Sequence, residues 1–209
     1  NGRNTSMVLG EQEKVLYGKG YIVDELMGMR FRISAKSFYQ VNPIQTKHLY
    51  QGALDMAGLT GKERVLDAYC GTGTIGMIAS RDAKEVTGVE LNRDAVRDAI
   101  TNAKTNQVKN ICFVCQDATE YICKAAEKKE NFDVVLMDPP RAGSTKEFVD
   151  AVISLAPERV VYVSCNPETL ARDLKWFTEE GYMPKEVTPV DMFPRTSHVE
   201  TCVLLSRKG

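Results

Sequence analysis

The chain has 209 residues, 43% of them hydrophobic and 26% charged, which is typical of a globular protein with one full core and room for a small extension. Its formal net charge is −1, so it lacks the positive surplus that a free-standing nucleic-acid-binding protein usually carries. No apolar run approaches the roughly 20 residues of a membrane-spanning helix, which excludes a membrane span, and no signal peptide is visible.

The N-terminal part of the sequence predicts a small β structure ahead of the main domain. Residues 1–10 are polar and predict a disordered lead-in, and a start at Asn1 without Met leads us to expect a piece of a longer protein. Strand-like runs at 14–17, 20–24 and 29–33, separated by glycines, predict a β-meander. We therefore expect residues 1–36 to form an N-terminal β extension and residues 37–209 to form the main domain.

The main domain alternates between strand-like and helix-like patterns. It begins with a loop at 37–43 and a helix that Pro43 opens and Gly58 ends. The strands are expected at 64–69, 85–90, 110–116, 132–138, 160–164, 186–191 and 199–205. Between them we expect a loop and helix at 71–80 and helices at 92–105, 118–128, 145–155 and 168–179. Alternating β and α units predict an α/β fold with a parallel sheet covered on both faces. Two consecutive strands at the end indicate that the last one inserts antiparallel.

A glycine-rich loop follows the first strand of this sheet. Gly71, Gly73 and Gly76 match the G-x-G-x-x-G spacing of a nucleoside-cofactor loop, and Glu90 ends the next strand about 20 residues on. Asp67 at the mouth of the loop would repel a pyrophosphate but attract the cationic groups of S-adenosylmethionine. Glu90 can accept hydrogen bonds from both ribose hydroxyls. We interpret the loop as an S-adenosylmethionine site, with NAD as the alternative.

Two further strand ends present chemically useful residues. The run 160–164 stops at Ser164-Cys165-Asn166-Pro167, and another strand ends in Asp138-Pro-Pro-Arg-Ala-Gly143. In open α/β sheets the carboxyl ends of the strands form the ligand edge, so we expect Cys165 to be a nucleophile presented there. A lone cysteine is more often a small buried hydrophobe, and the other motifs at the same edge favour the nucleophile.

The six cysteines indicate neither a disulfide framework nor a metal site. Most of them fall within predicted helices and strands, which favours a reducing, cytoplasmic setting. Cys112 and Cys115 form a C-x2-C pair, but no second pair or histidine cluster accompanies it, so we expect no metal.

Taken together, the motifs resemble the RNA uracil-C5 (m5U) methyltransferases that act on 23S ribosomal RNA and tRNA. The resemblance runs from about Phe38 to Leu205 and is carried by six fragments: Phe38-Tyr-Gln-Val-Asn42, Asp67-Ala-Tyr-Cys-Gly71, Gly88-Val-Glu90, Asp138-Pro-Pro-Arg-Ala-Gly143, Ser164-Cys-Asn-Pro167 and the segment from Asp191 to Thr201. It implies a Rossmann-like class I S-adenosylmethionine-dependent methyltransferase fold. It also implies an N-terminal RNA-binding β-barrel, and in many members an iron–sulfur segment, neither of which these 209 residues contain.

The resemblance also assigns roles to the matched positions. Cys165 would add to C6 of uracil, and Glu200 would remove the C5 proton. The cofactor would contact Gln40, Tyr69, Glu90 and Asp138, with Thr74 and Asp117 near it, beside the Asp67, Gly71 and Gly73 of the loop. Apart from the resemblance, His198 lies two residues before Glu200 and would share its face on a strand; we interpret it as a hydrogen-bonding support, with a catalytic histidine as the alternative. Phe38, Tyr39 and Phe193 are candidates for stacking on a base that has been turned out of the RNA, although such aromatic residues are more often part of the core.

We therefore expect an enzyme that methylates C5 of a uridine in RNA, with 23S ribosomal RNA as the first candidate substrate and tRNA as the second. It would use S-adenosylmethionine, act in the cytoplasm without a membrane or metal partner, and be monomeric. The alternatives are a nucleotide-dependent oxidoreductase that uses NAD, and a relative that binds RNA without catalysis.

Overall fold

The computed structural model describes residues 13–207, so the predicted lead-in at 1–10 lies outside the described residues. The strands are β1 (Tyr21–Leu26), β2 (Met29–Ser34), β3 (Arg64–Ala68), β4 (Glu85–Glu90), β5 (Ile111–Cys115), β6 (Val134–Met137), β7 (Arg159–Ser164), β8 (Tyr182–Val190) and β9 (Glu200–Arg207). The helices are α1 (Pro43–Ala57), α2 (Thr74–Ala79), α3 (Arg93–Thr105), α4 (Ala118–Glu127), α5 (Lys146–Leu155) and α6 (Pro167–Glu179). The predicted α/β alternation of the main domain is confirmed.

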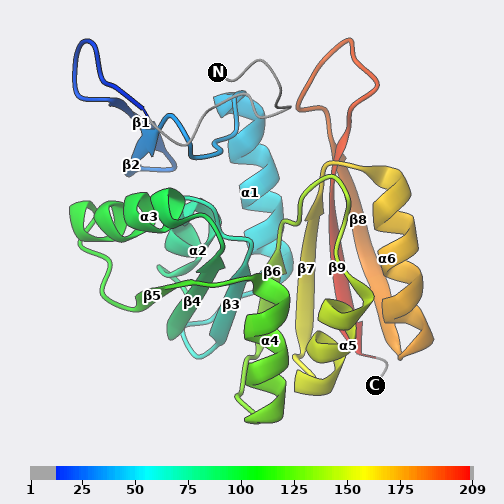
Figure 1. The fold of residues 1–209 in the computed structure, drawn as a ribbon. Coiled ribbons are helices and arrows are strands. Elements are labelled where there is room, and N and C mark those ends of the chain that lie inside the picture. The colour runs from blue at the N-terminus through cyan, green and yellow to red at the C-terminus, as the bar shows by residue number, and fades with distance from the viewer. Residues whose placement is uncertain (1–12, 208–209) are drawn as a thin grey trace.

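Seven strands form one sheet in the order β5-β4-β3-β6-β7-β9-β8 (Figure 1). The neighbouring pairs from β5 to β7 are parallel, whereas β9 is antiparallel to both β7 and β8. The prediction that the last strand inserts antiparallel is therefore confirmed. This insertion brings the start of β9 to the edge where β7 ends, since Thr201 pairs with Ser164.

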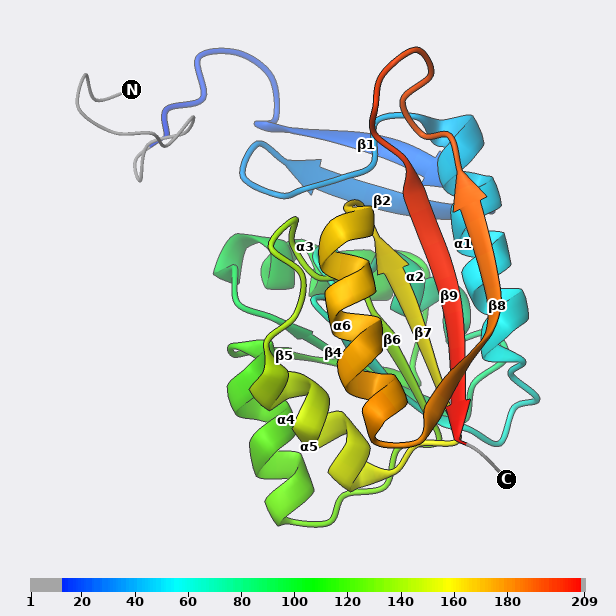
Figure 2. The same ribbon diagram turned by 90° about the vertical axis from the view of Figure 1, so that its right-hand side faces the viewer.

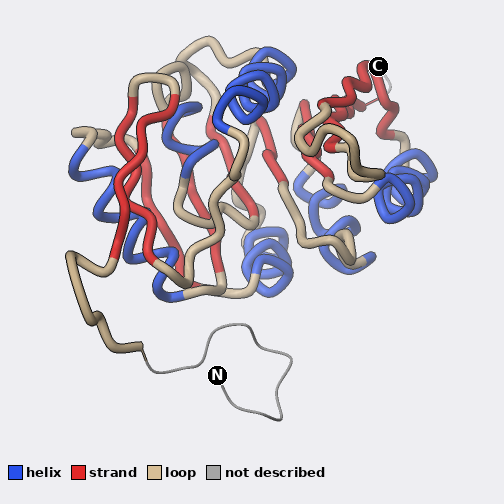
Figure 3. Tube along the Cα trace, turned by 90° about the horizontal axis from the view of Figure 1, so that it is seen from above, coloured by secondary structure: helices blue, strands red, loops and turns tan. Residues whose placement is uncertain are grey.

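Helices cover both faces of the sheet, as the side view shows (Figure 2). One hydrophobic cluster joins the sheet to α1, α2 and the β1–β2 hairpin, and a second joins it to α4, α5 and α6. Central strands such as β6 are buried along their whole length, as expected for a sheet with two covered faces. The view from above looks down on the loops that follow the parallel strands, which is the edge predicted to bind ligands (Figure 3).

In the described part of the N-terminal extension, residues 13–36, the strands form a two-stranded antiparallel hairpin and not the predicted meander. The run 14–17 has no regular structure, and Leu16 and Tyr17 are 86% and 97% exposed. With no apolar surface to cover these side chains, the run gains nothing from pairing as a third strand. The hairpin shares the first hydrophobic cluster through Leu26, Met29 and Phe31, and the division at residue 36 stays a prediction.

Helix α3 fixes the hairpin with a ladder of side chains. The side chain of Asn106 accepts a hydrogen bond from the backbone N–H of Arg30 and donates one to its carbonyl. The side chain of Asn102 makes the same two bonds with the backbone of Arg32. Asp98 accepts from the N–H of Ser34 at 2.9 Å. Residues four apart on a helix share one face, so these three side chains pair with the edge of β2 as a neighbouring strand would.

Most helix ends lie where the sequence predicts them, because the residues that cap helices can be recognised in the sequence. Asn92 accepts from the N–H of Asp94 at the start of α3, and Gly58 closes α1 in the left-handed conformation. Strand β8 begins at Tyr182, four residues before the predicted 186, and includes Pro184. Proline is tolerated there since β8 is an edge strand with an irregular register between Pro184 and Glu186.

Candidate active site

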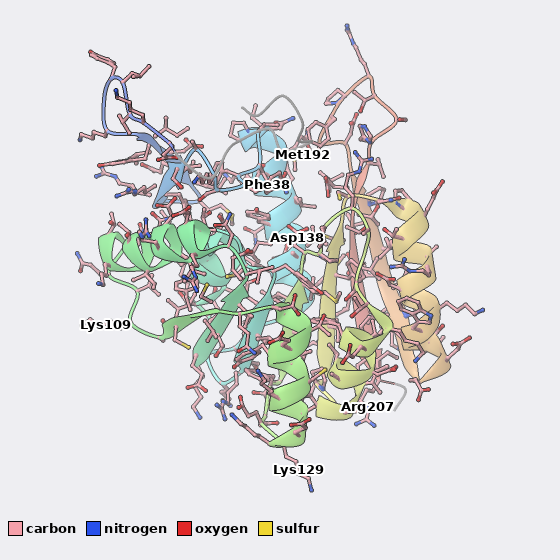
Figure 4. The ribbon with its side chains drawn as sticks, in the orientation of Figure 1. Phe38, Lys109, Lys129, Asp138, Met192 and Arg207 are labelled. Atoms are coloured by element: carbon pink, nitrogen blue, oxygen red, sulfur yellow. The ribbon has the colours of Figure 1, made fainter. Side chains whose placement is uncertain are left out.

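A cavity of about 570 Å³ opens at the carboxyl edge of the sheet. Its walls come from the loop before α1, the ends of β3, β4, β6 and β7, the start of α4 and the start of β9. Eight of the predicted site residues line it, namely Gln40, Tyr69, Gly71, Glu90, Asp117, Asp138, Cys165 and Glu200. Figure 4 labels Phe38 and Asp138 on this side of the molecule and Arg207 at the far end of β9. Segments far apart in the sequence therefore meet at one edge, which lies at the switch point between β3 and β6.

The remaining predicted residues lie below or beside the cavity. Asp67 and Thr74 line a smaller hollow of about 40 Å³, which shares Phe38, Gln40, Tyr69, Gly71 and Asp138 with the main cavity. Gly73 lines neither space. It directly precedes α2 as the N-cap with φ of +78°, and a Cβ atom there would lie 2.6 Å from the Phe113 ring. Only glycine satisfies both the backbone conformation and the close approach.

The glycine loop is held from the neighbouring strand. One carboxylate oxygen of Glu90 accepts from the N–H of Gly71 at 3.0 Å, and the other accepts from the N–H of Asn92 at 2.7 Å. Each oxygen keeps a second lone pair, so Glu90 can still accept bonds from a ligand. Asp117 caps α4 through the N–H groups of Thr119 and Glu120 and also faces the cavity.

Asp67 is buried beneath the glycine loop. Its carboxylate accepts from the N–H of Gly76 at 2.9 Å, and burial raises its pKa to about 7, with the nearby charge of Glu90 as a smaller cause. A Cβ atom on Gly76 would lie 2.5 Å from the same carboxylate oxygen, which explains the glycine. Asp67 thus supports the start of α2, and its attraction for a cationic ligand stays a prediction.

Asp138 lies at the junction of the cavity and the smaller hollow. Burial, together with the smaller effects of the charges on Glu200 and Asp67, raises its pKa to about 8. Three carboxyl groups thus share a poorly solvated region, where they cannot all be ionised at low cost. A positively charged ligand at this place would stabilise their ionised forms.

The antiparallel insertion of β9 brings Cys165 and Glu200 to the same cavity, because the residues next to them, Ser164 and Thr201, are paired. Cys165 is partly exposed, as expected for a reactive thiol, whereas Glu200 is only 4% exposed. One carboxylate oxygen of Glu200, Oε2, is buried without a hydrogen-bond partner in the part of the chain that the structure describes. A buried acceptor without a hydrogen-bond partner destabilises the folded state unless a ligand or a water molecule donates a bond to it.

The electrostatics of these two groups were not visible in the sequence. Burial raises the pKa of the Cys165 thiol, the charges of Glu200 and Asp138 add to this, and Arg141 opposes it. Burial also raises the pKa of Glu200, again opposed by Arg141. These surroundings therefore disfavour the thiolate on balance, and Arg141 offsets part of the effect.

The supporting residues differ from those expected. His198 lies in an exposed loop before β9, not on the strand, and its Nδ1 is 3.3 Å from Nη2 of Arg141. Of the stacking candidates, Phe38 lines the cavity mouth and is 72% exposed, whereas Tyr39 and Phe193 pack against the first hydrophobic cluster.

Sequence reasoning missed Asn166, whose side chain caps α6 and donates to the carbonyl of Arg141 at 3.1 Å. Its position directly after the cysteine and before a proline was the available signal.

The described residues contain no group of three or more His, Cys, Asp or Glu side chains that could hold a metal ion. All six cysteines are free, with Cys112 and Cys115 exposed on β5. Among the residues that the structure describes, no helix has the length and apolar character to cross a membrane.

Comparison with solved structures identifies the class of fold first. An S-adenosylmethionine-dependent methyltransferase from Agrobacterium tumefaciens is similar with a TM-score of 0.71 at 17% identity, over 92% of this chain and 72% of that chain. The crystal structure of Pyrococcus abyssi tRNA (uracil-54, C5)-methyltransferase, in complex with S-adenosyl-L-homocysteine, is similar with a TM-score of 0.81 at 32% identity, over 98% of this chain and 49% of that chain. The chain has the Rossmann-like fold of the class I S-adenosylmethionine-dependent methyltransferases, as predicted.

The family follows from the sequence comparison. The profile of the tRNA (uracil-5-)-methyltransferase family matches residues 7–208, and the chain belongs to this family. An uncharacterized RNA methyltransferase of Caldanaerobacter subterraneus subsp. tengcongensis is 49% identical over 207 residues, which are 99% of this chain and 46% of that protein. Another from Enterococcus faecalis is 47% identical over 207 residues, 99% of this chain and 45% of that protein. The chain spans about half the length of the curated relatives it matches.

Proposed function

We propose that this chain is the catalytic part of an enzyme that methylates C5 of a uridine in RNA, with S-adenosylmethionine as the methyl donor and Cys165 as a covalent nucleophile. The observation that carries the proposal is the shared cavity of Cys165, Glu200 and Asp138 at the carboxyl edge of a methyltransferase sheet. Membership of the uracil-5-methyltransferase family supports it and disfavours the NAD alternative.

The cavity suits the proposed cofactor in charge and shape. Its acidic residues, Glu90, Asp117 and Asp138, complement a ligand with a sulfonium and an amino group. Apolar walls from Val89, Leu91 and the Pro139-Pro140 pair suit an adenine ring. When bound, S-adenosylmethionine supplies an electrophilic methyl group.

The role of Cys165 follows from the electronics of uracil. C5 of uracil is a poor nucleophile until a thiolate adds to C6. In this step a bond forms between the sulfur of Cys165 and C6, and the electron pair of the C5–C6 double bond moves toward O4 as an enolate. C5 then carries the electron density that methylation requires.

The role of Glu200 completes the cycle. Its carboxylate accepts the proton from methylated C5, the electron pair re-forms the C5–C6 double bond, and Cys165 leaves as a thiolate. A pKa raised by burial strengthens the carboxylate as a base as long as it is ionised. The unpartnered Oε2 of Glu200 supports this role because it is a free acceptor next to the cavity.

The proposed substrate is a uridine turned out of folded RNA, and the exposed Phe38 at the cavity mouth suits a contact with a base. 23S ribosomal RNA, the first candidate from the sequence, and tRNA are separate arms of the assay. An RNA substrate and six free cysteines favour the cytoplasm as the compartment, and we expect a monomer.

The test is transfer of labelled methyl groups from S-adenosylmethionine to each RNA by the gene-encoded protein. We expect label in 5-methyluridine, lost in Cys165→Ala and kept in Cys112→Ala, which removes an exposed cysteine on β5 that does not line the cavity. Full transfer by the Cys165→Ala variant would refute covalent catalysis. Calorimetry that found NAD bound and S-adenosylmethionine not bound would refute the cofactor.

A further inference from the structure

The charges that line the cavity are strongly unbalanced. Four of the fifteen lining residues carry carboxylates and one carries a positive charge. The carboxylates are Glu90, Asp117, Asp138 and Glu200, and the cation is Arg141. A thiol that must ionise in these surroundings is repelled by the nearby charges of Glu200 and Asp138, and Arg141 is the lining residue that attracts it.

The guanidinium of Arg141 is braced from the β8–β9 loop. Its Nη2 lies 3.3 Å from Nδ1 of His198. Arginine only donates hydrogen bonds, so His198 accepts at Nδ1 and carries its proton on Nε2. His198 is held in turn by an edge-on contact with the Phe193 ring at 6.4 Å and by a bond from its own N–H to the hydroxyl of Thr196.

The backbone of Arg141 is tied to the turn that presents Cys165. Its carbonyl accepts from the side-chain amide of Asn166 at 3.1 Å and from the hydroxyl of Thr169 at 3.3 Å. Asn166 directly follows Cys165, and both donors belong to the first turn of α6 or its cap. The loop that carries Arg141 and the turn that carries Cys165 are therefore fixed to each other.

We propose that Arg141 is a positioning residue whose guanidinium, braced by His198, is the counter-charge that lets Cys165 ionise in an acidic cavity. The inference rests on the proposed function, since a thiolate is required only if Cys165 is the nucleophile. Arg141 lowers the pKa of both Cys165 and Glu200, against the larger effect of burial. It thus favours the reactive, ionised form of both groups.

The test measures ionisation of Cys165 directly. The rate of alkylation of Cys165 by iodoacetamide is followed from pH 7 to pH 11 by mass spectrometry of its peptide, in the gene-encoded protein without RNA. We expect Arg141→Met to move the midpoint upward by about one pH unit, which is the lower end of the effect of a close opposite charge. Arg141→Lys should restore part of the shift.

Two further sets of variants separate positioning from general charge. Arg195→Met removes an exposed arginine from the same loop as His198 but outside the cavity, and we expect it to leave the profile unchanged. His198→Ala should shift the midpoint in the same direction as Arg141→Met by a smaller amount, and His198→Gln, which keeps an acceptor, should shift it less. Circular dichroism reports folding, and Arg141→Gln replaces the methionine variant if that one unfolds.

An unchanged midpoint in a folded Arg141→Met or Arg141→Gln variant would overturn the inference, as would an equal shift in Arg195→Met. Because alkylation needs neither RNA nor methyl transfer, its outcome is independent of the proposed function. A shifted midpoint in a protein that methylates no RNA would contradict the proposed function but would support the electrostatic effect of Arg141 on Cys165.

Discussion

Asp138 makes the affinity for a cationic cofactor depend on pH. Burial and the charges of Glu200 and Asp67 raise its pKa to about 8, so below that pH the carboxyl group is mostly protonated. A cationic ligand favours the ionised form, so binding below pH 8 must release the proton. Affinity for S-adenosylmethionine should therefore rise with pH between 6 and 8 and level off above 8.

The size of the effect follows from the pKa. Each pH unit below the pKa of the unliganded carboxyl weakens binding by up to about tenfold, or about 1.4 kcal/mol. Between pH 8 and pH 6 we expect a loss of roughly ten- to a hundredfold. Isothermal titration calorimetry in buffers of different ionisation enthalpy measures both the affinity and the proton released.

Matched controls isolate the carboxyl group. Asp138→Asn should flatten the pH profile, whereas Asp150→Asn on the exposed surface of α5 should leave it unchanged. Adenosine has no sulfonium or amino-acid charge, so its affinity should vary much less. Equal affinity of the unmodified chain for S-adenosylmethionine at pH 6 and pH 8, or an unchanged slope in Asp138→Asn, would refute the reasoning.

Three further outcomes concern the fold and the loop. Gly73→Ala should destabilise the chain by at least about 1–2 kcal/mol and weaken cofactor binding, because φ is +78° and the new Cβ would lie 2.6 Å from the Phe113 ring. Thermal unfolding measures the loss of stability, and calorimetry measures the loss of cofactor affinity. Asn102→Ala leaves the N–H and carbonyl of Arg32 without their partners, so hydrogen exchange in β2 should speed up and stability fall by about 1–3 kcal/mol; unchanged protection of β2 would contradict the ladder. Folding raises the pKa of Asp138 from 3.8 to about 8, so the folded state holds this proton more tightly than the unfolded state. The free energy of unfolding of the unliganded chain, measured by chemical denaturation, should therefore fall as pH rises from about 4 to 8. The fall should be smaller in Asp138→Asn.

The sequence predicted the sheet and the placement of most site residues because both follow from local patterns. Apolar runs that end in turn residues marked the carboxyl ends of the strands, and Tyr69, Asp138 and Cys165 lie there. Two consecutive strand patterns at the C-terminus predicted the antiparallel insertion that places Glu200 next to the cysteine turn.

Features that depend on contacts distant in the sequence could not be predicted in this way. The run 14–17 has strand-like residues but no apolar surface to pack on, and its exposure is visible only in three dimensions. The ladder on α3 left a partial signal in the sequence, because Asp98, Asn102 and Asn106 are polar at a spacing of four. The sequence does not show that these side chains pair with the edge of β2. The raised pKa of Cys165 arises first from burial and then from the charges of Glu200 and Asp138 on other strands, so no local pattern contains it.

Covalent attachment of Cys165 to the pyrimidine is tested most directly by trapping it with RNA that contains 5-fluorouridine. In the presence of S-adenosylmethionine the sulfur should add to C6, and the fluorine at C5 leaves Glu200 no proton to remove, so the complex cannot resolve. We expect a protein–RNA adduct that survives denaturing electrophoresis and maps by mass spectrometry to Cys165. Methylation of unmodified RNA by the same preparation without any adduct, or an adduct on a different cysteine, would contradict the proposed chemistry.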